Sequence, residues 1–466
     1  MLNINEIVKL GVSEIINLFS SGELSPREVI SAHLNHCEER NQEINAVFDI
    51  RHEYAIQKAK ESEERWLKGK PIGALDGIPI LLKDSIKCKG FKYFHGSASY
   101  DGKPSNEDAP PAARIKEANG LVFGKTTMPD YGMIAAGVSS EFGIIRNPWN
   151  LNKSPGGSSA GSGAALAAGL APLSVGTDIA GSVRLPCAQN GLVGLKPSRG
   201  RIPHLAPSPI RAAGPMARNM NDLCVLMSVL VGEDYRDYES APACNGREFL
   251  KIKETSDRFL KDKRIGLMLD VGFGPKTDRR IVDLINEQAR ILGSLGAKIE
   301  IVPKLTKINP MRSLYTLVKS RAYHELKHRP IELQPNLLEH IKTWCHSIQD
   351  VTACELSDAL FELEEFKYEV NKNLQNFDYT VSPSLPIVSF SAEKVAPFED
   401  DHFLHCCFQI PFNQTGAPAL SINAGFIEGM PIGMQIIGRR YDDVGLLRVA
   451  WLFEQAKGEP INWPIN

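Results

Sequence analysis

The chain has 466 residues, of which 43% are apolar and 23% are charged, and its formal net charge is -2 at pH 7. This balance is typical of a globular protein with a large core, and it gives no overall electrostatic attraction to nucleic acid or to an anionic membrane. No apolar stretch approaches the roughly 18 unbroken residues that a membrane span requires, so no such span is expected.

Helix and strand patterns alternate in the first half of the chain. Ser25, Pro26 and Glu28 form a capping box with proline in the first turn, which predicts the start of a helix. The next predictions, in chain order, are an exposed charged helix over 51–70, a helix over 112–118, a buried strand over 120–124, a small-residue helix over 164–171, a strand that ends near Val175, and a polar connector over 235–263.

The second half continues the alternation. An amphipathic helix is predicted over 277–295, where Gln288 interrupts the apolar face and Gly296 stops the helix. The other predictions are strands over 264–270, 298–302, 379–382, 419–423 and 432–437, a mainly helical region over 305–377, and a final helix from Asp442 to about Gly458. This pattern indicates an α/β protein, and because no clean linker is visible, we expect one domain over 1–466.

The cysteines and the N-terminus bear on the compartment. The nine cysteines are scattered, with no C-x-x-C pair, which favours free and mostly buried thiols in a reducing environment. The first ten residues contain Asn, Glu and Lys and lack the apolar core of a signal peptide. A cytoplasmic location is therefore expected.

Three residues stand in separate Gly-rich, partly apolar segments: Lys83, Ser158 and Ser182. A serine hydroxyl is a poor nucleophile until a nearby base takes its proton. Lysine can be that base only when burial lowers its pKa and leaves the amine neutral. Lys83 ends the apolar run 78–82, which suits such burial, so the three residues can form a serine nucleophile that needs no histidine.

Glycine is concentrated between Ser154 and Gly200, where ten glycines occur. Gly and Ser together can indicate a flexible linker, but linkers lack the interleaved Ala, Leu, Val and Ile found here. The composition favours a backbone that approaches a ligand closely and exposes its amide N–H groups to it.

Two short motifs suggest other chemistry. His324, Glu325 and His328 match H-E-x-x-H, but no third zinc ligand follows, and a proline soon ends the helix. The segment 157–161 matches G-x-S-x-G, which would make Ser159 a nucleophile, yet the preceding segment 147–155 is polar, broken by proline and not strand-like. We therefore expect neither a metal nor another cofactor.

The segments around the three residues resemble the amidase signature of the amidase signature hydrolases. They read IPILLKD at 78–84, SPGGSSAG at 154–161 and TDIAGSVR at 177–184, and further matches are GALDGIP at 73–79, GKTTMP at 124–129, RNPW at 146–149, GLVGLKP at 191–197, GAPALS at 416–421 and GMPIGMQ at 429–435. The intervals of 75 and 24 residues between Lys83, Ser158 and Ser182 also match the family.

The resemblance covers nearly the whole chain and implies the architecture. It implies an α/β fold with a large mixed β-sheet core and helices on both faces. The signature core would span about 70–230, and a variable, mainly helical region over about 303–400 would line the substrate site.

The resemblance also implies roles for the three residues. Ser182 would attack the amide carbonyl, neutral Lys83 would be the ultimate base, and Ser158 would pass the proton between them. The peptide bond Gly157–Ser158 would be cis.

Backbone N–H groups of Ile179, Ala180, Gly181 and Ser182 would form the oxyanion hole, as the resemblance implies. The family usually has glycine at the position of Ala180. Alanine keeps its N–H, and the hole is preserved if φ of Ala180 is negative.

Four neighbouring residues receive supporting roles from the resemblance. Asp178 and Arg184 would form a network that holds the nucleophile loop, the alternative being two separately solvated charges. Gly132, with Met133, would line the acyl pocket, although Met133 fits ordinary core packing equally well.

The resemblance leaves two enzyme readings open. The first is a stand-alone amidohydrolase that cleaves a carboxamide C–N bond to acid and amine or ammonia. The second is the glutaminase subunit of an aminoacyl-tRNA amidotransferase, which works with partner chains and ATP. That subunit typically has SSLDQ before its Gly-Pro and DTGGS at the nucleophile, whereas this chain has SPIRAA at 208–213 and DIAGS at 178–182. Both differences favour the hydrolase.

A third reading, a catalytically silent binding protein, is opposed by the intact triad. The expected partner is a small-molecule amide, without nucleic acid or membrane, and a homodimer is left open. Specificity is expected around Met133 and in the segments 204–211 and 305–398. Arg211 could pair there with a substrate carboxylate or with a protein acid.

Overall fold

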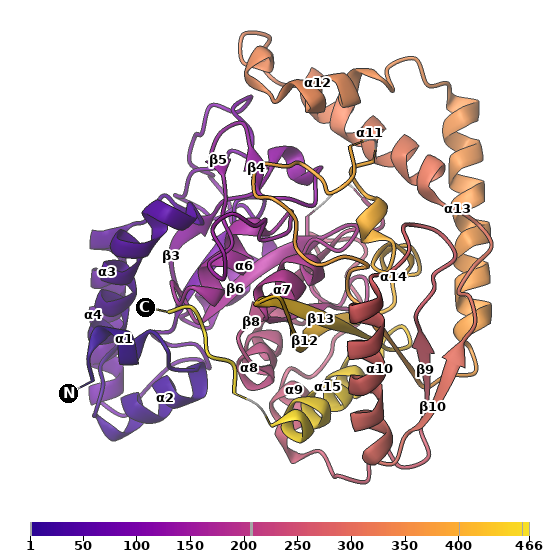
Figure 1. Ribbon diagram of the computed structural model, residues 1–466. Coiled ribbons are helices and arrows are strands. Elements are labelled where there is room, and N and C mark those ends of the chain that lie inside the picture. The colour runs from indigo at the N-terminus through magenta and orange to yellow at the C-terminus, as the bar shows by residue number, and fades with distance from the viewer. Residues whose placement is uncertain (1, 206–207, 400, 459, 466) are drawn as a thin grey trace.

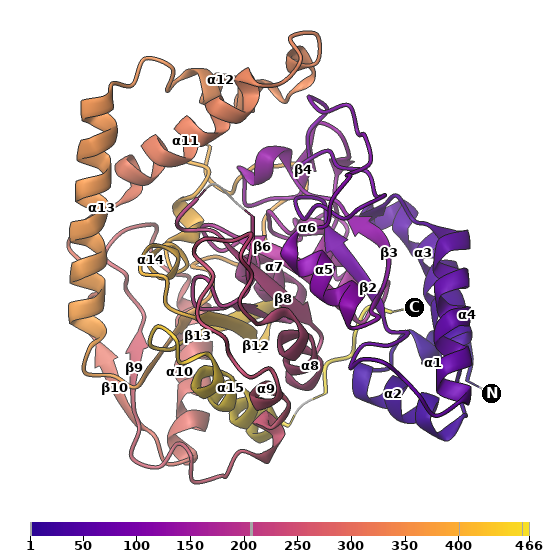
Figure 2. The same cartoon turned by 180° about the vertical axis from the view of Figure 1, so that it is seen from behind.

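The computed structural model describes residues 2–205, 208–399, 401–458 and 460–465. An 11-stranded sheet runs through the molecule, with helices on both of its faces (Figures 1 and 2). The prediction of a mixed sheet between two helical layers is confirmed.

The strands of this sheet come from the whole length of the chain. In spatial order they are β1 (Val47–Phe48), β3 (Leu121–Thr126), β2 (Pro79–Lys83), β6 (Leu173–Asp178), β8 (Ala212–Ala217), β7 (Val193–Lys196), β12 (Ala419–Ile427), β13 (Met430–Ile437), β11 (Tyr379–Pro383), β9 (Arg264–Met268) and β10 (Lys298–Val302). A separate two-stranded sheet pairs β4 (Val138–Ser139) with β5 (Gly143–Ile144).

The sheet combines parallel and antiparallel pairs. Strand β2 is parallel to β3 and β6, so the carboxyl ends of these three neighbours lie at one edge. Strand β8 is antiparallel to β6, and Ala212 at its start is paired with Asp178 at the end of β6. Strands β12 and β13 form an antiparallel hairpin in the middle of the sheet.

Fifteen α-helices occur in the described residues. They are α1 (Ile4–Ile7), α2 (Val12–Ser21), α3 (Pro26–Ile44), α4 (His52–Leu67), α5 (Pro110–Glu117), α6 (Ala160–Ala167), α7 (Arg184–Asn190), α8 (Met220–Leu230), α9 (Arg247–Leu250), α10 (Arg279–Ser294), α11 (Met311–Lys327), α12 (Glu339–His346), α13 (Ala353–Leu374), α14 (Ile410–Gln414) and α15 (Asp443–Lys457). Helices α11–α13 lie on the opposite side of the molecule from α1–α4 (Figures 1 and 2).

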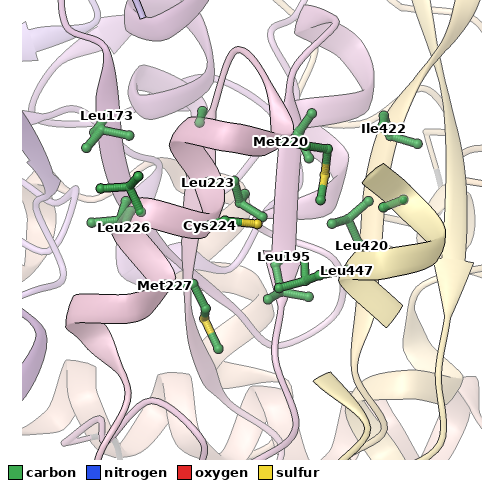
Figure 3. Close-up of a cluster of buried hydrophobic side chains, with 14 of the residues drawn as sticks. Leu173, Leu195, Met220, Leu223, Cys224, Leu226, Met227, Leu420, Ile422 and Leu447 are labelled. Atoms are coloured by element: carbon green, nitrogen blue, oxygen red, sulfur yellow. The ribbon is translucent and has the colours of Figure 1, made fainter. Parts of the chain in front are cut away.

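Alternating side chains divide the core between the two faces of the sheet. Ile80 and Leu82 of β2 join a cluster that also takes side chains from α2, α5, α8, α10 and α15. Leu81, between them, joins a cluster with α3, α4 and α6 on the other face. Figure 3 shows the first face, where Leu223 of α8 packs among side chains from β6, β7, β12 and α15.

Several helices and strands begin or end at residues other than those predicted. The small-residue helix predicted over 164–171 is α6, which begins at Ala160 and ends at Ala167, because Gly169 has a φ of 76° that a helix cannot continue. The strand predicted to end near Val175 continues to Asp178.

The polar connector predicted over 235–263 is partly structured. It contains α9 and a short 3-10 helix over Ile252–Glu254, and Phe249, Ile252 and Leu260 are buried in the core. These isolated apolar residues were too widely spaced to give a periodic pattern.

The sequence predicted free, mostly buried cysteines and no membrane span. All nine cysteines are free, and seven of them are buried. Among the described helices, none is both long and apolar enough to cross a membrane.

Replacement of Leu223 by alanine should destabilise the protein by about 2–5 kcal/mol, because a fully buried leucine leaves a cavity in the core of Figure 3. The matched control is Leu67→Ala at the end of α4, where the leucine is 81% exposed and the change should be close to zero. Urea unfolding followed by circular dichroism measures both. Equal losses in the two variants would contradict the assignment of this cluster as core.

Candidate active site

The candidate site lies where β2, β3 and β6 end. Lys83 is the last residue of β2, and Asp178 is the last residue of the adjacent parallel strand β6. The loop 179–183 then leads into α7, and Ser158 lies just before α6. Carboxyl ends of neighbouring parallel strands therefore bring together segments that are distant in the sequence.

Lys83 is fully buried and lies among hydroxyl groups. Its Nζ is 2.8 Å from Oγ of Ser158 and 3.0 Å from Oγ1 of Thr177. Burial, and next the positive charge of Arg211, hold the pKa of Lys83 well below the usual value of a lysine. A neutral amine is thereby favoured, and such an amine can accept a proton from Ser158.

Ser158 follows a cis peptide bond, Gly157–Ser158, as the resemblance to the family implied. Gly132 lies beside its side chain, and a Cβ added at Gly132 would be 3.1 Å from Oγ of Ser158. Gly132 also has a φ of 69°, which other residues rarely adopt. The structure therefore puts Gly132 against the hydroxyl that contacts Lys83.

Ser182 is the most exposed of the three residues, at 8%. Its carbonyl oxygen accepts a hydrogen bond of 3.2 Å from the N–H of Ser159, which places the Ser182 backbone beside the Ser158 segment. The Ser182 hydroxyl makes no hydrogen bond to any described residue. The structure thus joins Lys83 to Ser158 directly, and it places Ser182 next to them without a side-chain link.

Asp178 and Arg184 form a fully buried, bidentate ion pair. Nε and Nη2 of Arg184 lie 3.0 and 2.9 Å from the two carboxylate oxygens of Asp178. The same carboxylate accepts hydrogen bonds from the N–H groups of Gly181 and Val183, at 2.8 and 3.1 Å. These two amides flank Ser182, so Asp178 holds the loop that carries Ser182 on both sides.

Burial disfavours the charged form of Asp178, but the charge and hydrogen bonds of Arg184 and the amide of Asn413 overcome it, so the pKa of this carboxyl falls below its usual value. Arg184 also donates to Oε1 of Gln435 at 2.6 Å and to Oδ1 of Asn413 at 2.5 Å. The pair is thus one buried network rather than two solvated charges.

The backbone amides proposed for an oxyanion hole differ in their availability. The N–H of Gly181 is directed to Asp178 and is therefore occupied. The N–H groups of Ile179, Ala180 and Ser182 donate to no described residue and are available. Ala180 is not among the residues with positive φ, whereas Gly181 has a φ of 114°. Alanine therefore fits its position without the strain that a positive φ would cause.

The two competing motifs do not assemble alternative sites in the described residues. Ser159 is fully buried, and its Oγ donates to the carbonyl of Thr177 at 3.3 Å. In α11, Glu325 contacts His95 and the Tyr100 hydroxyl. No group of three or more His, Cys, Asp or Glu in the described chain is placed to hold a metal ion.

Some residues of the site had no role in the sequence analysis. Thr177 contacts Lys83, and Ser85 lies 3.3 Å from Thr177. Thr177 stood inside a recognised segment, so its neighbourhood was a signal. Asn413 gave no sequence signal, because its contact to Asp178 spans 235 residues.

The residues expected to determine substrate specificity lie in two different parts of the structure. His204, Arg211 and residues of α11 line a cavity of about 660 Å³ that reaches Ser85. Met133 is buried in a hydrophobic cluster with Ala180 and Leu185, which agrees with its reading as core. Residues 206 and 207 of the expected segment 204–211 lie outside the described residues.

The chain is similar to known proteins over most of its length. A family model described as Amidase matches residues 28–447. A glutamyl-tRNA(Gln) amidotransferase subunit from Symbiobacterium thermophilum is 30% identical over 489 residues, covering 96% of this chain and 96% of that protein.

Two solved structures are also similar. A bacterial aryl acylamidase of the amidase signature family has a TM-score of 0.88 and 26% identity, covering 97% of this chain and 99% of that chain. The 6-aminohexanoate cyclic dimer hydrolase in complex with its substrate has a TM-score of 0.86 and 27% identity, covering 97% of each chain.

Replacement of Arg184 by methionine should lower the free energy of unfolding by about 3–5 kcal/mol, because it leaves the carboxylate of Asp178 buried without its counter-charge. The double variant Asp178→Asn/Arg184→Met should lose less than the sum of the two single variants, since no unpaired charge remains. Urea unfolding of the four proteins measures this coupling. Strict additivity would show that the ion pair does not act as a unit.

Proposed function

Because the chain belongs to the amidase signature family and is an amide-hydrolysing enzyme, we propose that it cleaves a carboxamide C–N bond through an acyl-enzyme on Ser182. The observation that carries this proposal is the buried amine of Lys83, 2.8 Å from Oγ of Ser158. A desolvated, neutral amine in contact with a hydroxyl is a base that can activate a serine without histidine.

In the proposed acylation step, Oγ of Ser182 attacks the amide carbon while its proton passes to Ser158, and the proton of Ser158 passes to Lys83. The carbonyl oxygen becomes an oxyanion that accepts hydrogen bonds from the available N–H groups of Ile179, Ala180 and Ser182. When the C–N bond breaks, a proton returns through Ser158 to the leaving nitrogen. The products of this step are the ester of Ser182 and a neutral amine or ammonia.

In the proposed deacylation step, water takes the place of Ser182 as nucleophile and gives its proton to the same relay. The ester bond breaks, the acid is released, and Ser182 regains its hydrogen. The Asp178–Arg184 network supports both steps, because it fixes the amides on either side of Ser182.

Ser182→Ala should abolish turnover, and Lys83→Ala should reduce kcat/KM by at least about a hundredfold, because general acid–base catalysis is worth 10²–10⁴-fold. For the wild type, kcat/KM should rise with pH as Lys83 loses its proton and reach its plateau well below the ordinary lysine pKa of 10.5, since burial lowers that pKa. Kinetics over a pH series with an amide substrate, with Lys103→Ala as an exposed lysine control, test both points. A Lys83→Ala enzyme with half of the wild-type rate would exclude the lysine as base.

A second candidate is the glutaminase subunit of a glutamyl-tRNA(Gln) amidotransferase. Curated relatives named as this kind of subunit are 28–30% identical and cover 95–97% of the chain, and on this ground the sequence comparison supports this reading better than a stand-alone amidase. The segments 208–213 and 178–182 favour the stand-alone reading, since they lack the SSLDQ and DTGGS patterns expected of that subunit. Both candidates share the proposed chemistry at Ser182.

The isolated chain should release ammonia or amine from at least one simple amide without ATP, because Lys83, Ser158 and the 179–182 loop all come from this chain. The panel should include glutamine, aliphatic amides and aryl amides, with Ser182→Ala as the blank. Purification from the native host decides between the candidates. Co-purification with partner chains and a glutaminase rate that rises with them would establish the amidotransferase, whereas full activity alone on another amide would establish the stand-alone enzyme.

A further inference from the structure

The cavity beside the active site has an unusual excess of positive charge. It has a volume of about 660 Å³, and the charged side chains that line it are Lys87, Glu107, Arg211, Arg321, Glu325 and Arg329. It also includes Ser85, whose Oγ is 3.3 Å from Oγ1 of Thr177, which in turn is 3.0 Å from Nζ of Lys83. The cavity therefore adjoins the lysine side of the site.

The two acids of this cavity already have partners. Glu107 forms an ion pair with Lys87 at 2.9 Å. Glu325 contacts the ring of His95, and it accepts a hydrogen bond of 2.7 Å from the Tyr100 hydroxyl. Neither acid is within ion-pair distance of Arg211 or Arg321.

One of the three arginines is also engaged. Nε of Arg329 donates to the carbonyl of Glu325 at 3.3 Å, and its guanidinium lies 4.1 Å from the centre of the Tyr100 ring. Arg329 is thus fixed against the wall of the cavity.

Arg211 and Arg321 differ from Arg329, because their guanidinium groups make no hydrogen bond or ion pair with any described residue. Both side chains are half-buried, and they come from separate elements. Arg211 directly precedes β8, at the point where β8 starts beside the end of β6, and Arg321 is in α11. Two distant segments therefore bring two unpaired cations to the same cavity.

Their proximity is unfavourable without a ligand. Burial, and next the charge of Arg321, lower the pKa of Arg211 to about 10. Arginine side chains keep their charge in proteins, so the two guanidinium groups repel each other. Cations that are partly withdrawn from water are normally paired with an anion. The fork of a guanidinium matches the two oxygens of a carboxylate.

His204 gives a second, independent observation. It is 93% buried, since its exposed fraction is 7%, it lines the same cavity, and neither of its ring nitrogens has a hydrogen-bond partner. Burial and then the charge of Arg211 lower its pKa, so the ring is neutral and carries one N–H. An unused donor beside two unpaired guanidinium groups is suited to an anion.

We infer that this cavity binds a carboxylate of the substrate between Arg211 and Arg321, with His204 as a further donor, so that the enzyme acts on amides that carry an acid group. This inference rests on the proposed function for the statement that the ligand is a substrate. Sequence alone left Arg211 between a substrate carboxylate and a protein acid, and no described acid pairs with it.

The kinetic test compares acidic amides with neutral amides of equal chain length: succinamic, glutaramic and adipamic acids against butanamide, pentanamide and hexanamide. For at least one length, the wild-type kcat/KM for the acid should exceed that for the neutral amide by about tenfold or more, as a charge-assisted bidentate contact provides. In Arg211→Gln and Arg321→Gln, the ratio of acid to neutral kcat/KM should fall by about tenfold or more.

The matched control is Arg329→Gln, which removes the same charge from the same cavity wall but from a guanidinium that is already engaged. Its ratio should stay near the wild-type value. A ratio that falls equally in all three variants would show a general field effect, and a wild type that prefers the neutral amides would show that no carboxylate is bound. Either result overturns the inference.

A binding experiment separates this inference from the proposed function. Calorimetric titration of Ser182→Ala with succinate, glutarate and adipate should detect binding of at least one diacid, weakened about tenfold or more by an added Arg211→Gln. Binding that depends on Arg211 in an enzyme that hydrolyses no amide would refute the hydrolysis and keep the anion site. Hydrolysis without any diacid binding would keep the hydrolysis and refute the anion site.

Discussion

The site depends on the burial of one amine, that of Lys83, among hydroxyl groups. The nearby acid, Asp178, is already paired with Arg184. Lys83 has no exposed surface, and its nearest polar atoms are the oxygens of Ser158 and Thr177 rather than carboxylate oxygens. The negative charge of Asp178 acts to raise the pKa of Lys83, but burial and Arg211 act more strongly in the opposite direction. If Asp178 contacted the amine directly, it would hold the proton on Lys83, which could then not act as the proposed base.

Arg184 explains why Asp178 is not free to do so. The carboxylate of Asp178 accepts two guanidinium hydrogens and the amide of Asn413, in addition to two backbone amides. Its capacity as an acceptor is therefore used in fixing the loop of Ser182. The buried pair of Asp178 and Arg184 thus fixes the loop of the proposed nucleophile Ser182. It also leaves Lys83 without a direct counter-ion.

The sequence was most informative where local patterns decide the structure. The apolar run before Lys83 predicted its burial, and the capping box at Ser25 and the αL glycine at 458 marked helix ends that the structure confirms. Contacts across the fold could not be predicted in this way. The direction of the Gly181 amide depends on the carboxylate of Asp178, which is held by Arg184 of α7. The cavity shared by Arg211 and α11 depends on contacts between segments that are distant in the sequence. Neither of these two contacts gives a periodic pattern or a short motif in the sequence.

The Asp178–Arg184 network draws on residues near the end of the chain, which has a consequence for biosynthesis. Lys83, Ser158 and Ser182 leave the ribosome early, but Asn413 and Gln435, which complete the shell around Arg184, are translated more than two hundred residues after Asp178. The sheet also combines early and late parts of the chain, because β7 is paired with β12, the strand that follows α14. A nascent or truncated polypeptide that contains Ser182 but ends before Asn413 and Gln435 therefore lacks the contacts that complete the network around its loop, and this network can form only when synthesis is almost finished.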